Sequence, residues 1–86
     1  MIHQFTARVA DPEAGLATTE FCDRLYGRAA DATCSTRGGV VRVSFDRDAE
    51  SLETAVRSAI ADVVAAGGTV ASVEIEQQEI GQWLAQ

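Results

Sequence analysis

The order in which two hydrophobic periods alternate along the chain restricts its fold more than any other feature. Residues 2–10 (IHQFTARVA), 40–45 (VVRVSF) and 69–76 (TVASVEIE) alternate between apolar and polar side chains, which is typical of half-buried strands. Residues 51–67 instead repeat apolar side chains every three or four positions, the spacing of one helix face. The combination predicts a sheet covered by helices.

A second, less regular helix is predicted over residues 11–27. Asp11 is its expected N-cap, because Pro12 follows at the first helical position, where the fixed φ of proline is favourable. Apolar side chains recur at spacings of three and four residues, and Gly27 is expected to end the helix. Residues 31–37 (DATCSTR) form a short polar segment, the composition expected of a strand at a sheet edge.

Two short signals define the second half of the chain. The glycines at 38–39 predict a two-residue hairpin, since both positions can take positive φ. Ser51 stands directly before the stronger helix as its expected N-cap, and Gly67 stands where a C′ glycine belongs. The expected buried stripe of this helix consists of Leu52, Val56, Ala59, Ile60 and Val63.

The resulting element order, β-α-β-β-α-β, predicts an α+β fold of the ferredoxin-like kind. Two right-handed crossovers joined by a hairpin give a four-stranded antiparallel sheet of order 4-1-3-2, with both helices on one face. The domain is expected to span residues 1–78. Residues 79–86 are expected to form a C-terminal tail that could begin a truncated helix.

The composition narrows the classes of partner. With 86 residues the chain makes one small domain, which dimerisation would stabilise. Its net charge is −6 and it has no lysine, which argues against direct binding to nucleic acid. No apolar run reaches the length of a membrane span, and the N-terminus does not resemble a signal peptide. A cytoplasmic protein without a membrane contact or a cofactor is therefore expected.

The stretch FDRDAESLETAV, residues 45–56, concentrates carboxylates and could suggest a metal or acid–base site. Its spacing does not fit a calcium loop. We instead expect a solvated loop between strand and helix, with Glu53 favoured in the first helical turn by the helix dipole. The residues assigned to that loop are Asp46, Arg47, Asp48 and Glu50.

The remaining reactive side chains do not form a recognisable catalytic set. Cys22 and Cys34 are expected to be small buried hydrophobic residues rather than ligands or redox partners. His3, the only histidine, is expected to be partly buried and structural. No catalytic, cofactor-binding or metal-binding residue is therefore assigned.

The face of the sheet opposite the helices is the candidate interaction surface. Across it, Glu74 is expected to pair with Arg8. Two interpretations stay open: a solvated face with weak ion pairs, or a contact face for a second protomer or a small protein partner. The residues assigned to this interface are Thr6, Arg8, Val40, Arg42, Ser44 and Glu74.

Residues 39–67, GVVRVSFDRDAESLETAVRSAIADVVAAG, resemble a stretch shared by a group of small bacterial proteins. The resemblance extends over most of residues 20–76. It implies a βαββαβ domain that is often followed by a helix-turn-helix, in proteins thought to be DNA-binding regulators or antitoxin-like. Residues 78–86, QEIGQWLAQ, are similar to the opening of the first helix of such a motif. The family carries no catalytic residue over to this chain.

Two functions follow as expectations. The first is a non-catalytic protein-interaction or dimerisation module, such as the accessory domain of a bacterial DNA-binding regulator or antitoxin-like protein. The alternative is a regulatory domain that senses a small ligand. An enzyme is not expected, because no nucleophile, base and oxyanion group converge in the sequence pattern.

Overall fold

Six elements build an antiparallel α+β structure in the computed structural model, which describes residues 1–10, 18–37, 40–75 and 80–81. Their bounds are β1 (Ile2–Ala10), α1 (Thr18–Arg28), β2 (Ala32–Arg37), β3 (Val40–Asp48), α2 (Leu52–Ala65) and β4 (Thr69–Ile75). The expected N-cap Asp11, the glycine turn at 38–39 and most of the expected tail 79–86 lie outside the described residues.

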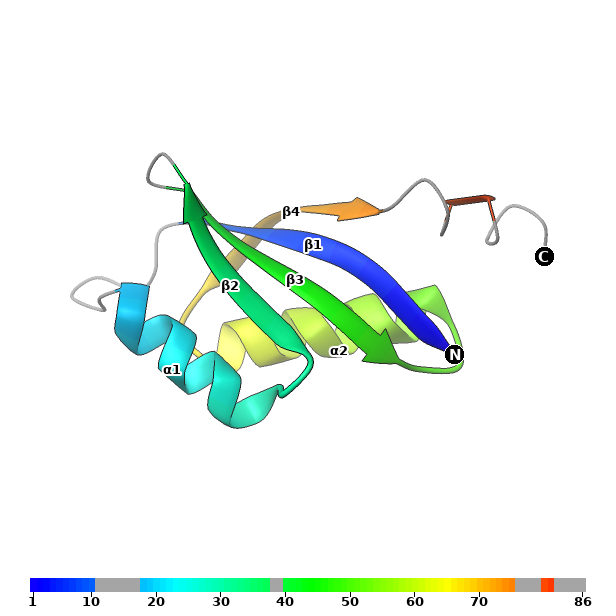
Figure 1. Cartoon of the computed structure of the whole chain (residues 1–86), viewed down its shortest axis with the longest axis horizontal. Coiled ribbons are helices and arrows are strands. Elements are labelled where there is room, and N and C mark those ends of the chain that lie inside the picture. Colours follow the sequence, from blue (N-terminus) through cyan, green and yellow to red (C-terminus); the bar gives the residue numbers. More distant parts are fainter. Residues whose placement is uncertain (11–17, 38–39, 76–79, 82–86) are drawn as a thin grey trace.

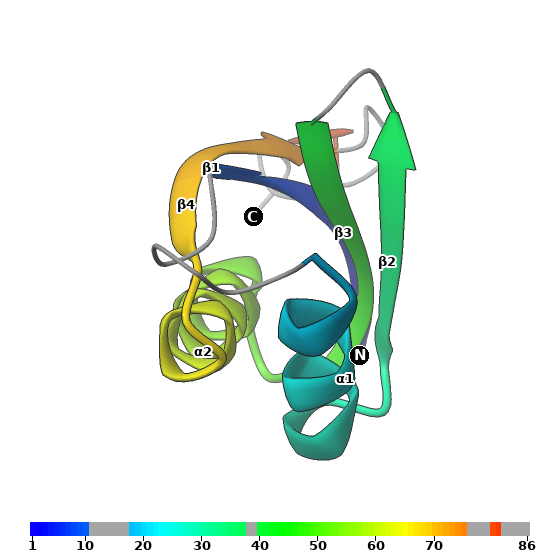
Figure 2. The same cartoon turned by 90° about the vertical axis from the view of Figure 1, so that its left-hand side faces the viewer.

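The four strands form one sheet in the order β2-β3-β1-β4, with every neighbouring pair antiparallel. Read from the β4 edge, this order is 4-1-3-2, so each strand has the neighbours that the sequence predicted. Both helices lie on one side of the sheet, α2 towards β4 and α1 towards β2 (Figures 1 and 2). The opposite face of the sheet is not covered by either helix.

The core lies between the sheet and the helices. Phe5 and Phe45 stack across β1 and β3, with ring centroids 5.3 Å apart. Phe21 and Leu25 of α1 are fully buried against this layer. The buried apolar side chains are Phe5, Ala7, Val9, Phe21, Leu25, Ala29, Ala32, Val41, Val43, Phe45, Leu52, Ala55, Ala59, Val63 and Ala66.

Two elements run further than the sequence pattern predicted. β3 continues through Asp48 instead of ending at Phe45, because its last residues pair with the start of β1. α1 passes through Gly27, the expected terminator, and the Ala29 N–H still donates to the Leu25 carbonyl at 2.8 Å. Glycine therefore does not end this helix; continued hydrogen bonding outweighs its low helix propensity.

The N-terminus of α2 has the expected cap, but its buried face is rotated from the expected stripe. Ser51 is the N-cap, and its Oγ accepts from the Thr54 N–H at 3.1 Å. Ala55 is fully buried, whereas Val56 and Ile60 are only half-buried. The small side chain of Ala55 suits the close contact between helix and core, and the larger side chains lie on a flank of the helix.

The C-terminus of α2 is a Schellman motif. Gly67 has φ 101°, and its N–H donates to the Val64 carbonyl at 3.0 Å. The Gly68 N–H reaches the Val63 carbonyl, also at 3.0 Å. A Cβ at Gly68 would lie 2.6 Å from Cε1 of Phe21, so this second glycine is required by the packing against α1.

An irregularity in the register of β4 changes which of its side chains face the helices. Phe5 pairs with Ile75 and Ala7 with Val73, but the register shifts between Arg8 and Val9. Beyond that shift Val70 is half-buried and Ala71 is exposed. A strict alternation over residues 69–76 would place Ala71 on the buried side with Val73 and Ile75, but the extra residue of a bulge reverses the alternation.

Candidate interaction surfaces

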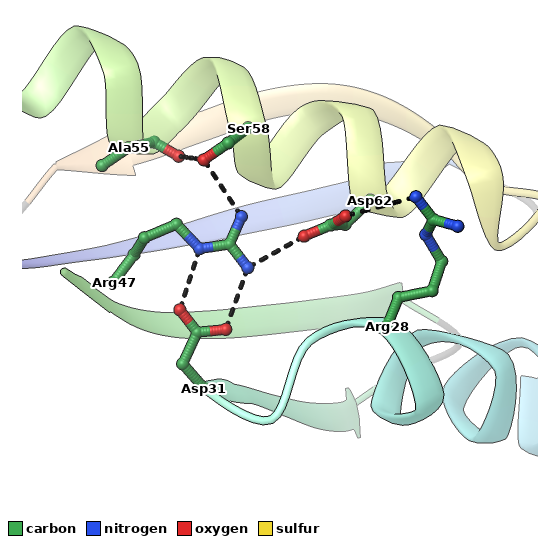
Figure 3. A network of polar contacts seen from close by, with 6 residues as sticks. All are labelled: Arg28, Asp31, Arg47, Ala55, Ser58 and Asp62. Atoms are coloured by element: carbon green, nitrogen blue, oxygen red, sulfur yellow. Dashed lines mark hydrogen bonds and ion pairs between the residues drawn. The ribbon is translucent and has the colours of Figure 1, made fainter. Parts of the chain in front are cut away.

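Arg47 is the centre of a polar network between β3 and the helices (Figure 3). Its Nε and Nη2 atoms donate to the two carboxylate oxygens of Asp31 at 2.8 and 2.9 Å, a bidentate pair. Nη2 also lies 2.9 Å from Oδ2 of Asp62, and Nη1 donates to Oγ of Ser58 at 3.1 Å. The guanidinium carbon is 5.1 Å from the centroid of the Phe45 ring. We call this network, together with Arg28, the Arg47 clasp.

Every charged side chain of the Arg47 clasp lies beside a side chain of opposite charge. Only 12% of the Arg47 side chain is exposed. Its hydrogen bonds hold the pKa of the Asp31 carboxyl below the usual range, and the same contact raises the pKa of Arg47. Arg28 lies 3.6 Å from the other oxygen of Asp62. Each charge in the clasp has an opposite partner, which indicates that the network fastens β3 to the turn before β2 and to α2.

The position of Arg47 corrects the expectation of a solvated loop. Because β3 continues past Phe45, the alternation places Arg47 on the same side of the strand as that ring, facing the helices. Extending the strand pattern two residues further would have found it. The apparent charge run of residues 46–53 had concealed this signal.

The carboxylates of the same stretch are distributed over separate places rather than brought to one site. Asp46 is exposed on β3. Asp48 accepts a hydrogen bond from the Met1 amino group at 2.8 Å, which lowers the pKa of its carboxyl. Glu53 pairs with Arg57 one turn along α2 at 2.7 Å. In the described part of the chain, no group of three or more ligating side chains could hold a metal ion.

The residues assigned to the interface do share the face of the sheet opposite the helices. Their register places Thr6 opposite both Ser44 and Glu74, and Arg8 opposite Arg42. This open face consists of Thr6, Arg8, Val40, Arg42, Ser44 and Glu74, and whether it contacts a partner stays a prediction.

The ion pair on the open face differs from the expected one. Arg42 Nη1 lies 2.9 Å from Glu74 Oε1, so the pair reaches over β1 from β3 to β4. The sequence had suggested Arg8 as the partner of Glu74. Arg8 lies opposite Ser72 on β4 instead, two residues along the strand from the Thr6–Glu74 pair. The side chains of Arg42 and Glu74 are 41% and 61% exposed, so solvent screens the pair and it contributes little to stability.

At the β2 edge, outward-pointing backbone groups are capped by the chain itself. The Asp46 N–H donates to the Asp31 carbonyl, so the hydrogen-bonding alternation directs the N–H groups of Ala32 and Cys34 away from β3. The Ala32 N–H donates to the Ala29 carbonyl at 3.3 Å. The Cys34 N–H donates to the Tyr26 hydroxyl at 2.8 Å. This edge is therefore partly closed to another strand.

The β4 edge differs in its chemistry. Val73 and Ile75 are half-buried side chains on the strand, and α2 runs beside them. A groove of about 280 Å³ opens between helix and strand, lined by Leu52, Glu53, Val56 and Ile75. Three of these four lining residues are apolar, so this edge combines a strand with an apolar hollow.

The two cysteines are neighbours in the structure. Cys22 of α1 and Cys34 of β2 are free thiols, half-buried rather than buried as expected. Burial, followed by the contact with Cys22, raises the pKa of the Cys34 thiol to about 12. A thiol in this state is a weak nucleophile at neutral pH. His3 lies on the helix side of β1 and is 3% exposed, deeper than expected.

Comparison of the chain with protein-family models, with curated proteins and with solved structures found no match in any of the three. None of the helices within the described ranges is long and apolar enough to cross a membrane. The function is therefore inferred from the surfaces themselves.

Proposed function

We propose that this chain is a non-catalytic protein-interaction and dimerisation module with ferredoxin-like topology. The observation that carries the proposal is the apolar groove beside the β4 edge, on a domain of 86 residues. A domain this small buries a limited share of its apolar surface by itself, so covering such a groove with a partner adds stability.

The charged clusters support the non-catalytic part of the proposal. Arg47 directs its guanidinium donors to Asp31, Asp62 and Ser58, contacts that join elements of the fold. The raised pKa of Cys34 disfavours a thiolate nucleophile. These groups are engaged in packing rather than aimed at a common point where a substrate atom could react.

The cellular context that we propose follows the resemblance of residues 39–67. The chain would act in the cytoplasm as the accessory domain of a bacterial DNA-binding regulator or of an antitoxin-like protein. Its net charge of −6 favours contact with protein rather than direct contact with nucleic acid.

Sedimentation velocity on the purified chain tests the proposal. We expect self-association, or a complex with the protein encoded by the neighbouring gene, at micromolar concentrations. A control with a protein of matched size and charge identifies nonspecific association. A chain that stays at 9.1 kDa alone and in the mixture would contradict the proposal.

The groove also favours a second candidate, a domain that senses a small apolar ligand. Its volume of about 280 Å³ is close to the lower end of ligand pockets, and Glu53 supplies one charged group at its rim. A ligand present at about 100 times its dissociation constant would stabilise the fold by about 2.7 kcal/mol. Thermal-shift screening would detect it, and Val56→Phe, which fills the groove, should abolish the shift.

A further inference from the structure

The backbone of β4 directs hydrogen-bonding groups outward. The Ala49 N–H donates to the Met1 carbonyl, so the odd-numbered residues of β1 exchange hydrogen bonds with β3. The backbone N–H and C=O groups of the even-numbered residues therefore point towards β4. Ser72 and Glu74, opposite Arg8 and Thr6, therefore exchange hydrogen bonds with β1. Val73 and Ile75 point their N–H and C=O groups away from the sheet.

These outward groups are not capped as those of β2 are. Among the described residues, no helix, turn or side-chain group donates to or accepts from the backbone of Val73 or Ile75. An edge strand with free groups of this kind is a template for another strand.

An apolar helix flank accompanies this edge. Val56, Ile60 and Val64 follow one another at spacings of four along α2, and Val64 is 58% exposed. Ser58 and Asp62 occupy the opposite flank, where they meet the Arg47 clasp. The apolar flank therefore faces away from α1, on the side of the groove and of Ile75. We call the three flank residues together with Val73 and Ile75 the β4 strip.

We propose that a second copy of this chain covers the β4 strip, with its own β4 pairing antiparallel to the first. This inference rests on the proposed function and names the partner. Two sheets would become one sheet of eight strands, and the two α2 flanks would pack together beneath the junction. An isolated peptide strand would satisfy the edge but leave Val64 in water, whereas a second copy supplies a strand and an apolar helix flank at matching positions.

Charge selects the register of the pairing. With the two-fold axis at Val73, Glu74 of each chain lies opposite Ser72 of the other, and Ile75 lies opposite Ala71. Arg8 is the neighbour of Ser72 within its own sheet, so each Glu74 gains a cation in the same row. An axis at Glu74 would instead place the two Glu74 carboxylates directly opposite, which is unfavourable.

The first test compares two exposed positions of α2 in the full chain. We expect the wild type to sediment as a dimer, with twice the 9.1 kDa mass of one chain. Val64→Glu should raise the dissociation constant of the dimer about tenfold or more. Ala61→Glu adds the same carboxylate to another exposed position of this helix, outside the β4 strip, and should leave the constant unchanged. Circular dichroism verifies that both variants fold.

The second test reads the register directly. In Val73→Cys, the two introduced thiols would face each other in a hydrogen-bonded pair, with Cα atoms about 5.5 Å apart, which suits a disulfide. Mild oxidation should then give a covalent dimer. Thr33→Cys on the β2 edge carries the same native thiols and should stay monomeric on denaturing gels.

Particular outcomes overturn the inference. The inference fails if the wild type stays monomeric up to its solubility limit. It also fails if Val64→Glu and Ala61→Glu weaken dimerisation equally, or if the two cysteine variants form covalent dimers to the same extent. If the monomer binds a different purified protein, the second-copy inference fails and the proposed function survives. If it binds neither itself nor the neighbouring gene product, both fail.

Discussion

The two edges of the sheet differ in whether their outward backbone groups are capped. At β2, the Tyr26 hydroxyl and the Ala29 carbonyl accept outward N–H groups, and the Arg47 clasp fastens the turn leading into the strand. At β4, which forms the other edge of the sheet (Figures 1 and 2), apolar side chains of the strand and of α2 lie beside backbone groups that no described residue caps.

One small sheet can therefore close one of its edges in part while the other keeps outward backbone groups that no described residue caps. Polar caps remove the hydrogen-bonding template for a second strand. Exposed apolar side chains have the opposite effect, because a partner that covers them removes apolar surface from water and so gains binding free energy. The same four strands therefore have one edge whose outward N–H groups are partly capped and one whose outward groups no described residue caps.

Removing the clasp should have the largest effect on stability. Arg47→Ala leaves the carboxylates of Asp31 and Asp62 partly buried without their main cation, which we expect to lower the free energy of unfolding by about 2–4 kcal/mol. Arg42→Ala removes the exposed pair with Glu74 and should cost less than about 1 kcal/mol. Urea denaturation measures both, and equal losses would refute the distinction between clasp and surface pair.

Steric fit at the entry to β4 gives the next largest effect. Gly68→Ala places a Cβ 2.6 Å from Phe21 Cε1 and 3.0 Å from Val9 Cγ1. Because Phe21 is fully buried, we expect a loss of about 1–3 kcal/mol. Gly27→Ala, where a Cβ meets nothing within 4 Å, should stabilise α1 by about 0.5–1 kcal/mol. Thermal unfolding decides, and a Gly68→Ala variant as stable as the wild type would show that the entry to β4 is looser than described.

Opening the β2 edge should have a smaller effect. Tyr26→Phe removes the acceptor of the outward Cys34 N–H, and we expect a loss of about 1 kcal/mol. Amide hydrogen exchange at Cys34 should become faster, while exchange at Val43, in the interior strand, should change only with global stability. Unchanged protection at Cys34 would mean that the hydroxyl does not cap this edge.

The acid dependence of stability should give the smallest effect. Arg47 lowers the pKa of Asp31 in the folded state, so the unfolded chain binds more protons in acid. The stabilisation is present above the unfolded pKa of about 4 and is lost as pH falls through the folded value. Asp31→Asn and Arg47→Ala should each flatten the acid side of the stability profile, measured by denaturation at several pH values. If the free energy of unfolding of the variants depends on pH as steeply as that of the wild type, Asp31 does not contribute to acid unfolding.

Local signals predicted much of the fold. The Ser51 cap and the Gly67 terminator of α2 need only neighbouring residues, because both satisfy backbone groups of the same turn. The alternation in β1 likewise identified a half-buried strand, and the polar composition of β2 identified a strand at the sheet edge. The open-face residues followed from the same alternation.

Other features needed distant contacts. Val56 and Ala55 differ by one position, and only the neighbouring elements of the fold decide which of them is buried. Pairing with the first residues of β1 extends β3, which places Arg47 beside the helices. The register shift opposite Arg8 then moves Ala71 to the exposed side.

The kind and order of the elements follow from local sequence patterns, since hydrophobic period and capping act within a few residues of one another. The partners of Arg47, the cap on β2 and the β4 strip instead depend on how the helices and strands pack together. Each of these depends on side chains or backbone groups that lie far apart in the chain and meet only when the helices pack on the sheet. The difference between the two edges is therefore a property of the fold rather than of any single segment.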